Sequence, residues 1–301
     1  MKCIKIISLF CLLTATGQTF AQDSTASLLS ILEKEMDQTR DMTIYTTATF
    51  KTTRLINGHS VENVGKGVLD VKISHRFGNV SEGFYELFGL DKASMRMGFD
   101  YGITKNIMIG VGRSTFQKTY DGFIKVKILQ QSRGKKNMPV TLSYVPTIAL
   151  KTIRYEDPTI DNRFSSRLSY SHQLIIGRKF SDKTSLQLMP VFIHQNLVSL
   201  ASESNDIFAI GIGGRQKLSK RISFNAEYYY VLPATKLNGT SNSLSVGFDI
   251  ETGGHVFQLH FTNSQGMNER TFIADTKGKW QKGDIYFGFN ISRVFTINKK
   301  H

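Results

Sequence analysis

Apolar residues recur at every second position over many stretches of about ten residues in this chain. The clearest case is 221–232, where one face carries Ile222, Phe224, Ala226, Tyr228, Tyr230 and Leu232. The opposite face carries Ser223, Asn225, Glu227 and Tyr229. A period of two is the side-chain period of a β-strand, so each stretch predicts a strand with one apolar and one polar face. This pattern limits the chain to an antiparallel β architecture.

The connections between the strands distinguish a soluble sandwich from a barrel. We expect strands at 66–77, 94–103, 106–115, 121–131, 138–151, 166–180, 184–197, 206–218, 221–232, 242–251, 254–264 and 284–297. The joins at ITKN, SRGKKNM, SDK, LSKR and ETGG are short, whereas those between them are mostly longer and polar. Short turns at one rim and long loops at the other are typical of outer-membrane barrels, whose strands need about 9–11 residues to cross.

The fold prediction is therefore all-β: a transmembrane antiparallel β-barrel of about 12 strands with a short N-terminal helix. An even strand number places both chain ends at the short-turn rim, in the periplasm. The helix is expected over 27–38, where Ser30 and Glu33 have capping-box spacing. Because only alternate residues face lipid, the slightly negative mean hydropathy of −0.19 agrees with a membrane protein. A soluble, lipid-binding β protein found in the periplasm is the alternative fold.

The N-terminus predicts export. Lys2 and Lys5 precede an apolar run, and a Thr-Phe-Ala sequence at 19–21 offers small residues for cleavage. We divide the chain into a signal peptide at 1–21, an N-terminal periplasmic or lumenal segment at 22–64, and an outer-membrane β-barrel at 65–301. Both cysteines, Cys3 and Cys11, leave with the signal peptide. The predicted location is the cell outer membrane.

Charge suggests what the barrel interior contacts. Of the 38 basic residues, two leave with the signal peptide, so the mature chain has 36 basic and 24 acidic residues and a net charge of +12. An exported protein rarely meets nucleic acid, so lipids, lipopolysaccharide or a small anionic solute are the expected partners. Alternation places twelve charged residues in the lumen: Asp70, Lys72, Arg76, Arg96, Asp100, Lys125, Lys127, Lys179, Arg215, Lys217, Glu227 and Asp249.

Eight of these twelve residues are basic, which leaves two interpretations open. Charged rings that line a water-filled pore set its ion selectivity, so the lumen would prefer anions. Alternatively, the Lys and Arg side chains pair with the acids across a narrow barrel and close it. We expect a monomeric barrel that is a passive channel with a basic lumen or an envelope accessory, not an enzyme, with no cofactor and no metal.

Several sequence motifs resemble those of a known family. The motifs are RLINGHSVENVGKGVLD, ISHRFG, FGLD, DYGIT, GVGRSTFQKTYDGF and QLHFTNSQG. They resemble an uncharacterised family of bacterial outer-membrane β-barrel proteins that is classed as a domain of unknown function. The resemblance spans most of 45–296 and implies the fold and the location. It implies no substrate and no catalytic residues.

Two other functions compete with the channel. His260 and Ser264 flank a strand end where an outer-membrane lipid hydrolase would place its base and nucleophile. A structural or docking barrel would instead bind a partner through the N-terminal helix or the long loops.

Asp157, Asp161 and Asn162 offer oxygen ligands for a hard cation, although a solvated loop explains them better. The glycine-rich GVGR and GIGGR stretches do not complete a phosphate-binding motif.

Overall fold

The computed structural model describes residues 28–34, 42–154 and 163–297, which form two units. The smaller unit contains a helical stretch at 28–34 and a two-stranded antiparallel sheet of β1 (Thr43–Tyr45) and β6 (Ser132–Gly134). The predicted helix at 27–38 is therefore present over 28–34, and its other residues lie outside the described ranges. Strand β6 lies in the SRGKKNM connection, which the sequence alone predicted to be a plain turn.

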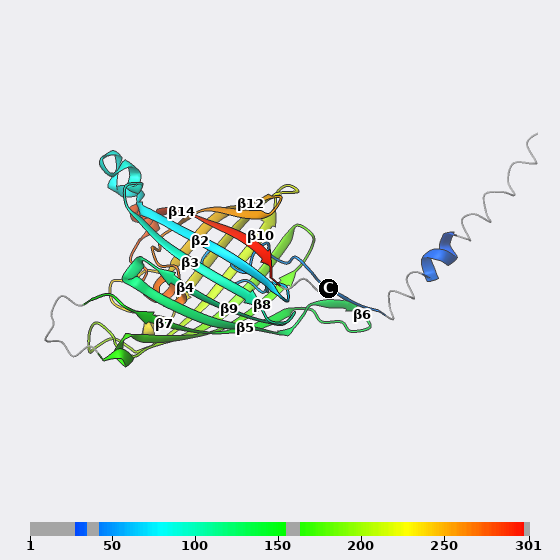
Figure 1. Ribbon diagram of the computed structural model, residues 1–301, viewed down its shortest axis with the longest axis horizontal. Coiled ribbons are helices and arrows are strands. Elements are labelled where there is room, and N and C mark those ends of the chain that lie inside the picture. Colours follow the sequence, from blue (N-terminus) through cyan, green and yellow to red (C-terminus); the bar gives the residue numbers. More distant parts are fainter. Residues whose placement is uncertain (1–27, 35–41, 155–162, 298–301) are drawn as a thin grey trace, which may run out of the picture. The chain divides into compact units, whose positions relative to one another are not determined.

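The larger unit is a closed barrel of twelve strands (Figure 1). They are β2 (Val68–Asn79), β3 (Ala93–Gly102), β4 (Ile107–Ser114), β5 (Thr119–Leu129), β7 (Thr141–Lys151), β8 (Leu168–Lys179), β9 (Thr184–Gln195), β10 (Asp206–Lys217), β11 (Ile222–Val231), β12 (Ser243–Thr252), β13 (His255–Thr262) and β14 (Tyr286–Thr296). Each pairs antiparallel with its neighbour along the chain, and β14 pairs with β2 to close the barrel. The predicted fold class is confirmed.

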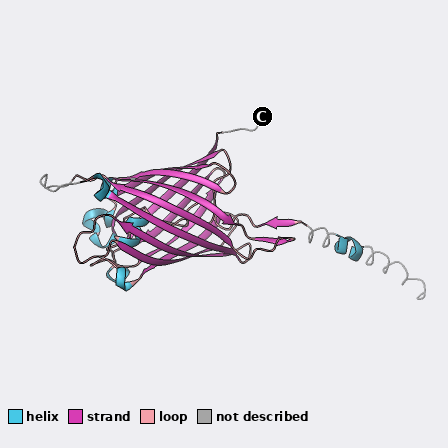
Figure 2. Ribbon diagram, turned by 90° about the horizontal axis from the view of Figure 1, so that it is seen from below, coloured by secondary structure: helices cyan, strands magenta, loops and turns pink. Residues whose placement is uncertain are grey.

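The connections differ at the two ends of the barrel, as the loop lengths predicted. The short helical turns all lie in the long connections: η1 (Val80–Glu82), η2 (Phe84–Gly89), η3 (Phe116–Lys118), η4 (Phe164–Arg167), η5 (Pro233–Thr235), the π-helix η6 (Arg270–Ala274) and η7 (Trp280–Lys282). Figure 2 shows these turns gathered at one end of the barrel, which we call the long-loop end. None of the helices in the described ranges is long and apolar enough to cross a membrane.

The outer surface of the wall is apolar, because the alternate residues of each strand that point outward are mostly hydrophobic. Met97, Phe99, Ile109 and Val111 on β3 and β4 are exposed, whereas their inward neighbours Arg96, Gly98, Gly110 and Gly112 are buried. An exposed apolar band flanked by rims is the surface that a transmembrane barrel presents to lipid.

A charge placed in the middle of this band is expected to destabilise the barrel. Val111 lies in the middle of β4 and is 60% exposed, and Ile128 lies one residue from the end of β5 and is 54% exposed. Val111→Arg should cost about 2–4 kcal/mol in lipid, whereas Ile128→Arg near the rim should cost about 0–1 kcal/mol. Urea unfolding of protein refolded into phospholipid vesicles measures both. Equal losses in the two variants would mean that this surface does not face lipid.

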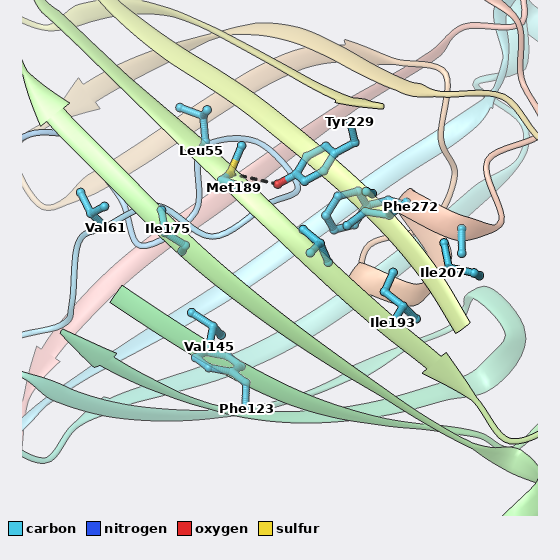
Figure 3. Close-up of a cluster of buried hydrophobic side chains, with 14 of the residues drawn as sticks. Leu55, Val61, Phe123, Val145, Ile175, Met189, Ile193, Ile207, Tyr229 and Phe272 are labelled. Atoms are coloured by element: carbon cyan, nitrogen blue, oxygen red, sulfur yellow. Dashed lines mark hydrogen bonds between the residues drawn. The ribbon is translucent and has the colours of Figure 1, made fainter. Parts of the chain in front are cut away.

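The interior has an apolar core on one side. Inward-facing side chains of β4 to β11 form it, including Met108, Phe123, Val145, Ile175, Met189, Ile193, Ile207 and Tyr229. Figure 3 shows Leu55, Val61 and Phe272, which belong to no wall strand, among these side chains. The Tyr229 hydroxyl donates a hydrogen bond to the Met189 sulfur at 3.2 Å. Segments outside the wall therefore complete the packing of the lumen.

Candidate functional site

A hairpin at residues 53–60 lies inside the barrel, and we call it the lumenal hairpin. Its chain reverses at Ile56 and Asn57, where Leu55 N–H donates to the Gly58 carbonyl at 2.8 Å and Ser60 N–H donates to the Thr53 carbonyl at 3.0 Å. All eight of its residues are buried. Gly58 leaves no room for a larger residue, because a Cβ atom there would lie 1.9 Å from the Tyr229 hydroxyl.

The tip of the hairpin is bound by one carboxylate of the wall. Glu227 points inward from β11 and accepts hydrogen bonds from the backbone N–H groups of Asn57 (2.7 Å), Gly58 (3.2 Å) and Ile56 (3.3 Å). Successive N–H groups that converge on one acceptor form a concave anion-binding site. Glu227 is itself buried, so these bonds replace the water that the carboxylate loses.

The carbonyl groups of the hairpin and of the residues after it are bound by wall donors. Lys125 on β5 donates to the carbonyls of Thr53 (2.9 Å), Ser60 (3.0 Å) and Glu62 (2.9 Å). Side-chain amides bind three further carbonyls: Gln187 that of His59 (2.8 Å), Gln258 that of Leu55 (2.8 Å) and Asn290 that of Ile56 (3.1 Å). The wall thus recognises the backbone of the hairpin from several sides.

Ion pairs connect the wall strands beside the hairpin. Lys72 lies 3.0 Å from Asp70 and also contacts Asp100, which accepts a hydrogen bond from the Thr53 hydroxyl at 3.1 Å. Arg96 on β3 binds Asp121 on β5 through two nitrogens, with its Nε at 2.9 Å. Because these charges are buried, each needs its partner to offset the loss of hydration.

The long loop between β13 and β14 meets the hairpin from the long-loop end. The guanidinium of Arg54 donates to the Glu269 carboxylate at 2.9 Å, and the His59 ring lies 3.4 Å from the same oxygen. Burial lowers the pKa of His59, which lies outside the wall strands, well below its usual value, so the ring is neutral at pH 7. Phe272 of η6 packs edge-on against Tyr229, with ring centroids 5.2 Å apart. Hairpin and loop therefore meet inside the barrel.

The structure places the twelve predicted lumenal residues in two groups. Nine are buried inside the barrel: Asp70, Lys72, Arg76, Arg96, Asp100, Lys125, Arg215, Glu227 and Asp249. Lys127, Lys179 and Lys217 are half-buried at the ends of their strands, next to the short turns. The buried basic residues bind acids, amides, hydroxyl groups or main-chain carbonyls: Arg76 donates to the Asn57 side chain at 2.7 Å, and Arg215 donates to the Ser223 hydroxyl at 3.0 Å. Around the lumenal hairpin these side chains therefore contact protein atoms of the hairpin and of one another.

Other residues of the site escaped prediction from the sequence. Asp121 lies four residues before Lys125 on β5 and on the same face of the strand. The alternation of polar and apolar residues would therefore have been enough to predict that Asp121 points into the lumen. Arg54, His59 and Glu269 lie in non-periodic segments, for which the sequence has no comparable signal.

The hydrolase alternative is not supported by the geometry. His260 and Ser264 are both buried inside the barrel, away from the lipid-facing surface. Neither ring nitrogen of His260 has a hydrogen-bond partner among the described residues, and the Ser264 hydroxyl oxygen accepts from Gly266 N–H at 3.2 Å. A buried serine without an adjacent base has no activated nucleophile.

The candidate cation ligands Asp157, Asp161 and Asn162 lie outside the described residues. Within the described part, no group of three or more His, Cys, Asp or Glu side chains is arranged to hold a metal ion.

Several solved structures resemble this chain at low sequence identity. Among solved structures, the NanC porin is 9% identical with a TM-score of 0.48, covering 76% of this chain and 98% of that one. An outer membrane channel from Pseudomonas putida F1 is 11% identical with a TM-score of 0.45, covering 78% and 98%. A search of curated proteins gave no match. A family described as "Membrane bound beta barrel domain (DUF5777)" matches residues 50–295. The family resemblance drawn from the motifs is thus confirmed, and this chain belongs to that family of membrane-bound β-barrels.

Proposed function

We propose that this protein is an outer-membrane passage for small anionic solutes that the lumenal hairpin closes in the state described. The chain is exported, loses residues 1–21, and resides in the outer membrane as a monomer in contact with lipid and lipopolysaccharide. The apolar residues exposed along β3 to β14 support a barrel surrounded by lipid.

The observation that carries this proposal is the polar attachment of the hairpin. A twelve-stranded barrel is wider than the eight-stranded barrels that side chains alone can fill, so a separate segment is needed to close it. Glu227, Lys125, Gln187, Gln258 and Asn290 bind that segment through hydrogen bonds. Water can replace such bonds when the hairpin leaves, whereas a purely apolar interface would leave a dry surface exposed.

The sign of the inner charge supports an anion. The predicted lumenal set contains eight basic residues, and six acids of the described strands lie on the same inner surface when Asp121 and Glu251 are added to Asp70, Asp100, Glu227 and Asp249. Without the hairpin carbonyls of Thr53 and Ser60, the Lys125 ammonium would face the lumen. A basic pore wall favours anions.

Single-channel conductance under a salt gradient tests the proposal with two variants. Deleting residues 50–61 removes the hairpin between Thr49 and Glu62, which are already joined by a 2.7 Å hydrogen bond. The pair Val61→Cys and Gly177→Cys locks the hairpin to β8, because a Cβ atom at position 177 would lie 3.4 Å from that of Val61. The mature chain contains no other cysteine if the signal peptide is removed.

The expected result is steady conductance with an anion-favouring reversal potential for the deletion variant, and silence for the oxidised locked variant. Reducing the disulfide should restore the behaviour of the unmodified chain. A deletion variant that inserts but never conducts would contradict the passage and favour the docking barrel. A locked variant that conducts as well as the deletion variant would mean that the hairpin is not the barrier.

A further inference from the structure

A cavity lies inside the barrel mouth at the long-loop end, away from the lumenal hairpin. It has a volume of about 400 Å³ and lies among the ends of β7, β8 and β9, the loop between β9 and β10, and η6. Small-molecule sites have volumes of about 300–1,000 Å³, so this cavity has room for a small solute. We call it the mouth cavity.

The charge of the mouth cavity is mainly positive. Lys151, Arg167 and Arg270 line it, and Asp275 is the one acid among the lining residues that the structure describes. Arg270 is held in place by Gln195 (2.9 Å), Gln117 (2.6 Å) and Asp275 (3.2 Å). Lys151 and Arg167 lie beside the pair of Arg270 and Asp275 and add to the positive charge of the described lining.

Two hydrogen-bond donors of the mouth cavity lack an acceptor. The Lys151 ammonium has neither a hydrogen bond nor an ion pair within the described part of the chain. Gln195 is 97% buried, and its Oε1 accepts from Arg270 while its Nε2 has no partner in the ranges that the structure describes. A buried donor without an acceptor costs about 1–3 kcal/mol, so these groups favour a ligand rich in acceptors.

The lining also indicates that the ligand is a soluble molecule. Ser169 and Gln195 are inward-facing residues of β8 and β9, and their outward neighbours Tyr170 and His194 face away from the cavity. These two positions therefore open to the inside of the barrel mouth rather than to the lipid-facing surface. Hydroxyl groups of Ser166, Ser169 and Ser199 lie beside the apolar side chains of Leu197, Val198 and Leu237. Such a mixture suits a short hydroxylated carbon chain.

We propose that the mouth cavity binds a small hydroxylated organic acid as the first step of its entry. Lys151 and Gln195 Nε2 bind the carboxylate, Arg270 adds positive charge nearby, and the serine hydroxyls bind hydroxyl groups of the ligand. This inference rests on the proposed function, because a solute bound in the mouth cavity can cross the membrane only through the passage below it. Binding and conductance are separate measurements, so failure of one is distinguishable from failure of the other.

Isothermal titration of the refolded full chain in detergent tests the site with gluconate and sorbitol. These two probes share a six-carbon polyol chain and differ by a carboxylate. A charge-assisted hydrogen bond contributes about 1.5–3 kcal/mol, so gluconate should bind at least about tenfold more tightly than sorbitol. Inorganic phosphate serves as a third probe and should bind more weakly than gluconate, because it cannot use the serine hydroxyls as the polyol does.

Three variants assign the binding to this cavity. Lys151→Met should weaken gluconate binding about tenfold or more, and Lys151→Arg should change it by less than about threefold. Lys105→Met, in the short turn between β3 and β4 at the opposite end of the barrel, is the matched control and should leave the affinity unchanged. Heat-dependent mobility on gels checks that each variant is folded. Equal affinities for gluconate and sorbitol, absence of gluconate binding, or equal losses in Lys151→Met and Lys105→Met would overturn the proposal.

Discussion

Replacing Glu227 by alanine is expected to release the lumenal hairpin without unfolding the barrel. The substitution removes the acceptor of three backbone N–H groups at Ile56, Asn57 and Gly58, all of which are buried. Each buried donor without an acceptor costs about 1–3 kcal/mol, so the docked hairpin loses about 3 kcal/mol or more. That loss raises the population of the released hairpin by about two orders of magnitude.

The release can be followed through a cysteine at position 60. Ser60 is fully buried, so Ser60→Cys reacts with a water-soluble maleimide only when the hairpin leaves its site. Glu227→Ala should speed this reaction about a hundredfold at pH 7. Asp249→Asn is the control: it changes an inward carboxylate on the neighbouring strand and keeps an oxygen for Gln258, so the rate should stay near that of the parent. Unchanged labelling in Glu227→Ala would show that other contacts retain the hairpin.

The second large effect is expected at the pair formed by Arg54 and Glu269. Both side chains are buried and their charged groups are 2.9 Å apart, so removing one partner leaves an uncompensated charge inside the barrel. Such a loss costs about 3–5 kcal/mol. Arg54→Met or Glu269→Gln alone should therefore speed modification of the cysteine at position 60 by about two orders of magnitude or more.

The double variant distinguishes direct pairing from two separate effects. Arg54→Met combined with Glu269→Gln removes both charges, so its labelling rate should lie close to the parent and below that of either single variant. The double-mutant cycle then gives a coupling free energy of about 2 kcal/mol or more between hairpin and loop. If the two effects simply add, the ion pair does not connect the loop to the hairpin.

The contact of Glu227 with the hairpin and the ion pair of Arg54 with Glu269 explain why the hairpin stays inside a barrel whose wall is rich in basic residues. The excess of Lys and Arg on the wall suggested an anion-selective pore or a set of cross-barrel ion pairs, and the structure shows a third use of the charge. Lys125 and Arg215 bind main-chain carbonyls of residues 48–62, and Arg76 binds the Asn57 side chain. A basic wall thus recognises the oxygen atoms of an uncharged backbone, which composition alone does not reveal.

The strands, their facing and the order of the barrel were determined by the sequence itself. Alternation is a local property, since neighbouring side chains of a strand point to opposite faces whatever lies further along the chain. Lys72 and Asp100 could therefore be assigned to the inner face from their own strands. The alternation fails at Val145, Ile175 and Met189, which are inward and apolar, because on those strands the lipid and the lumenal core both favour hydrophobic residues.

Only the tertiary structure decided what fills the barrel. The hairpin tip is bound by Glu227, 170 residues after Asn57, and Arg54 is bound by Glu269, 215 residues away. No periodicity connects such distant positions, and residues 46–64 have no alternation of their own. Their conformation depends on donors and acceptors that converge only after the wall has closed. The wall could be predicted because the alternation of side chains depends only on neighbouring residues of each strand. The position of the hairpin and the mouth cavity could not, because they arise from contacts between segments that meet only after the barrel has formed.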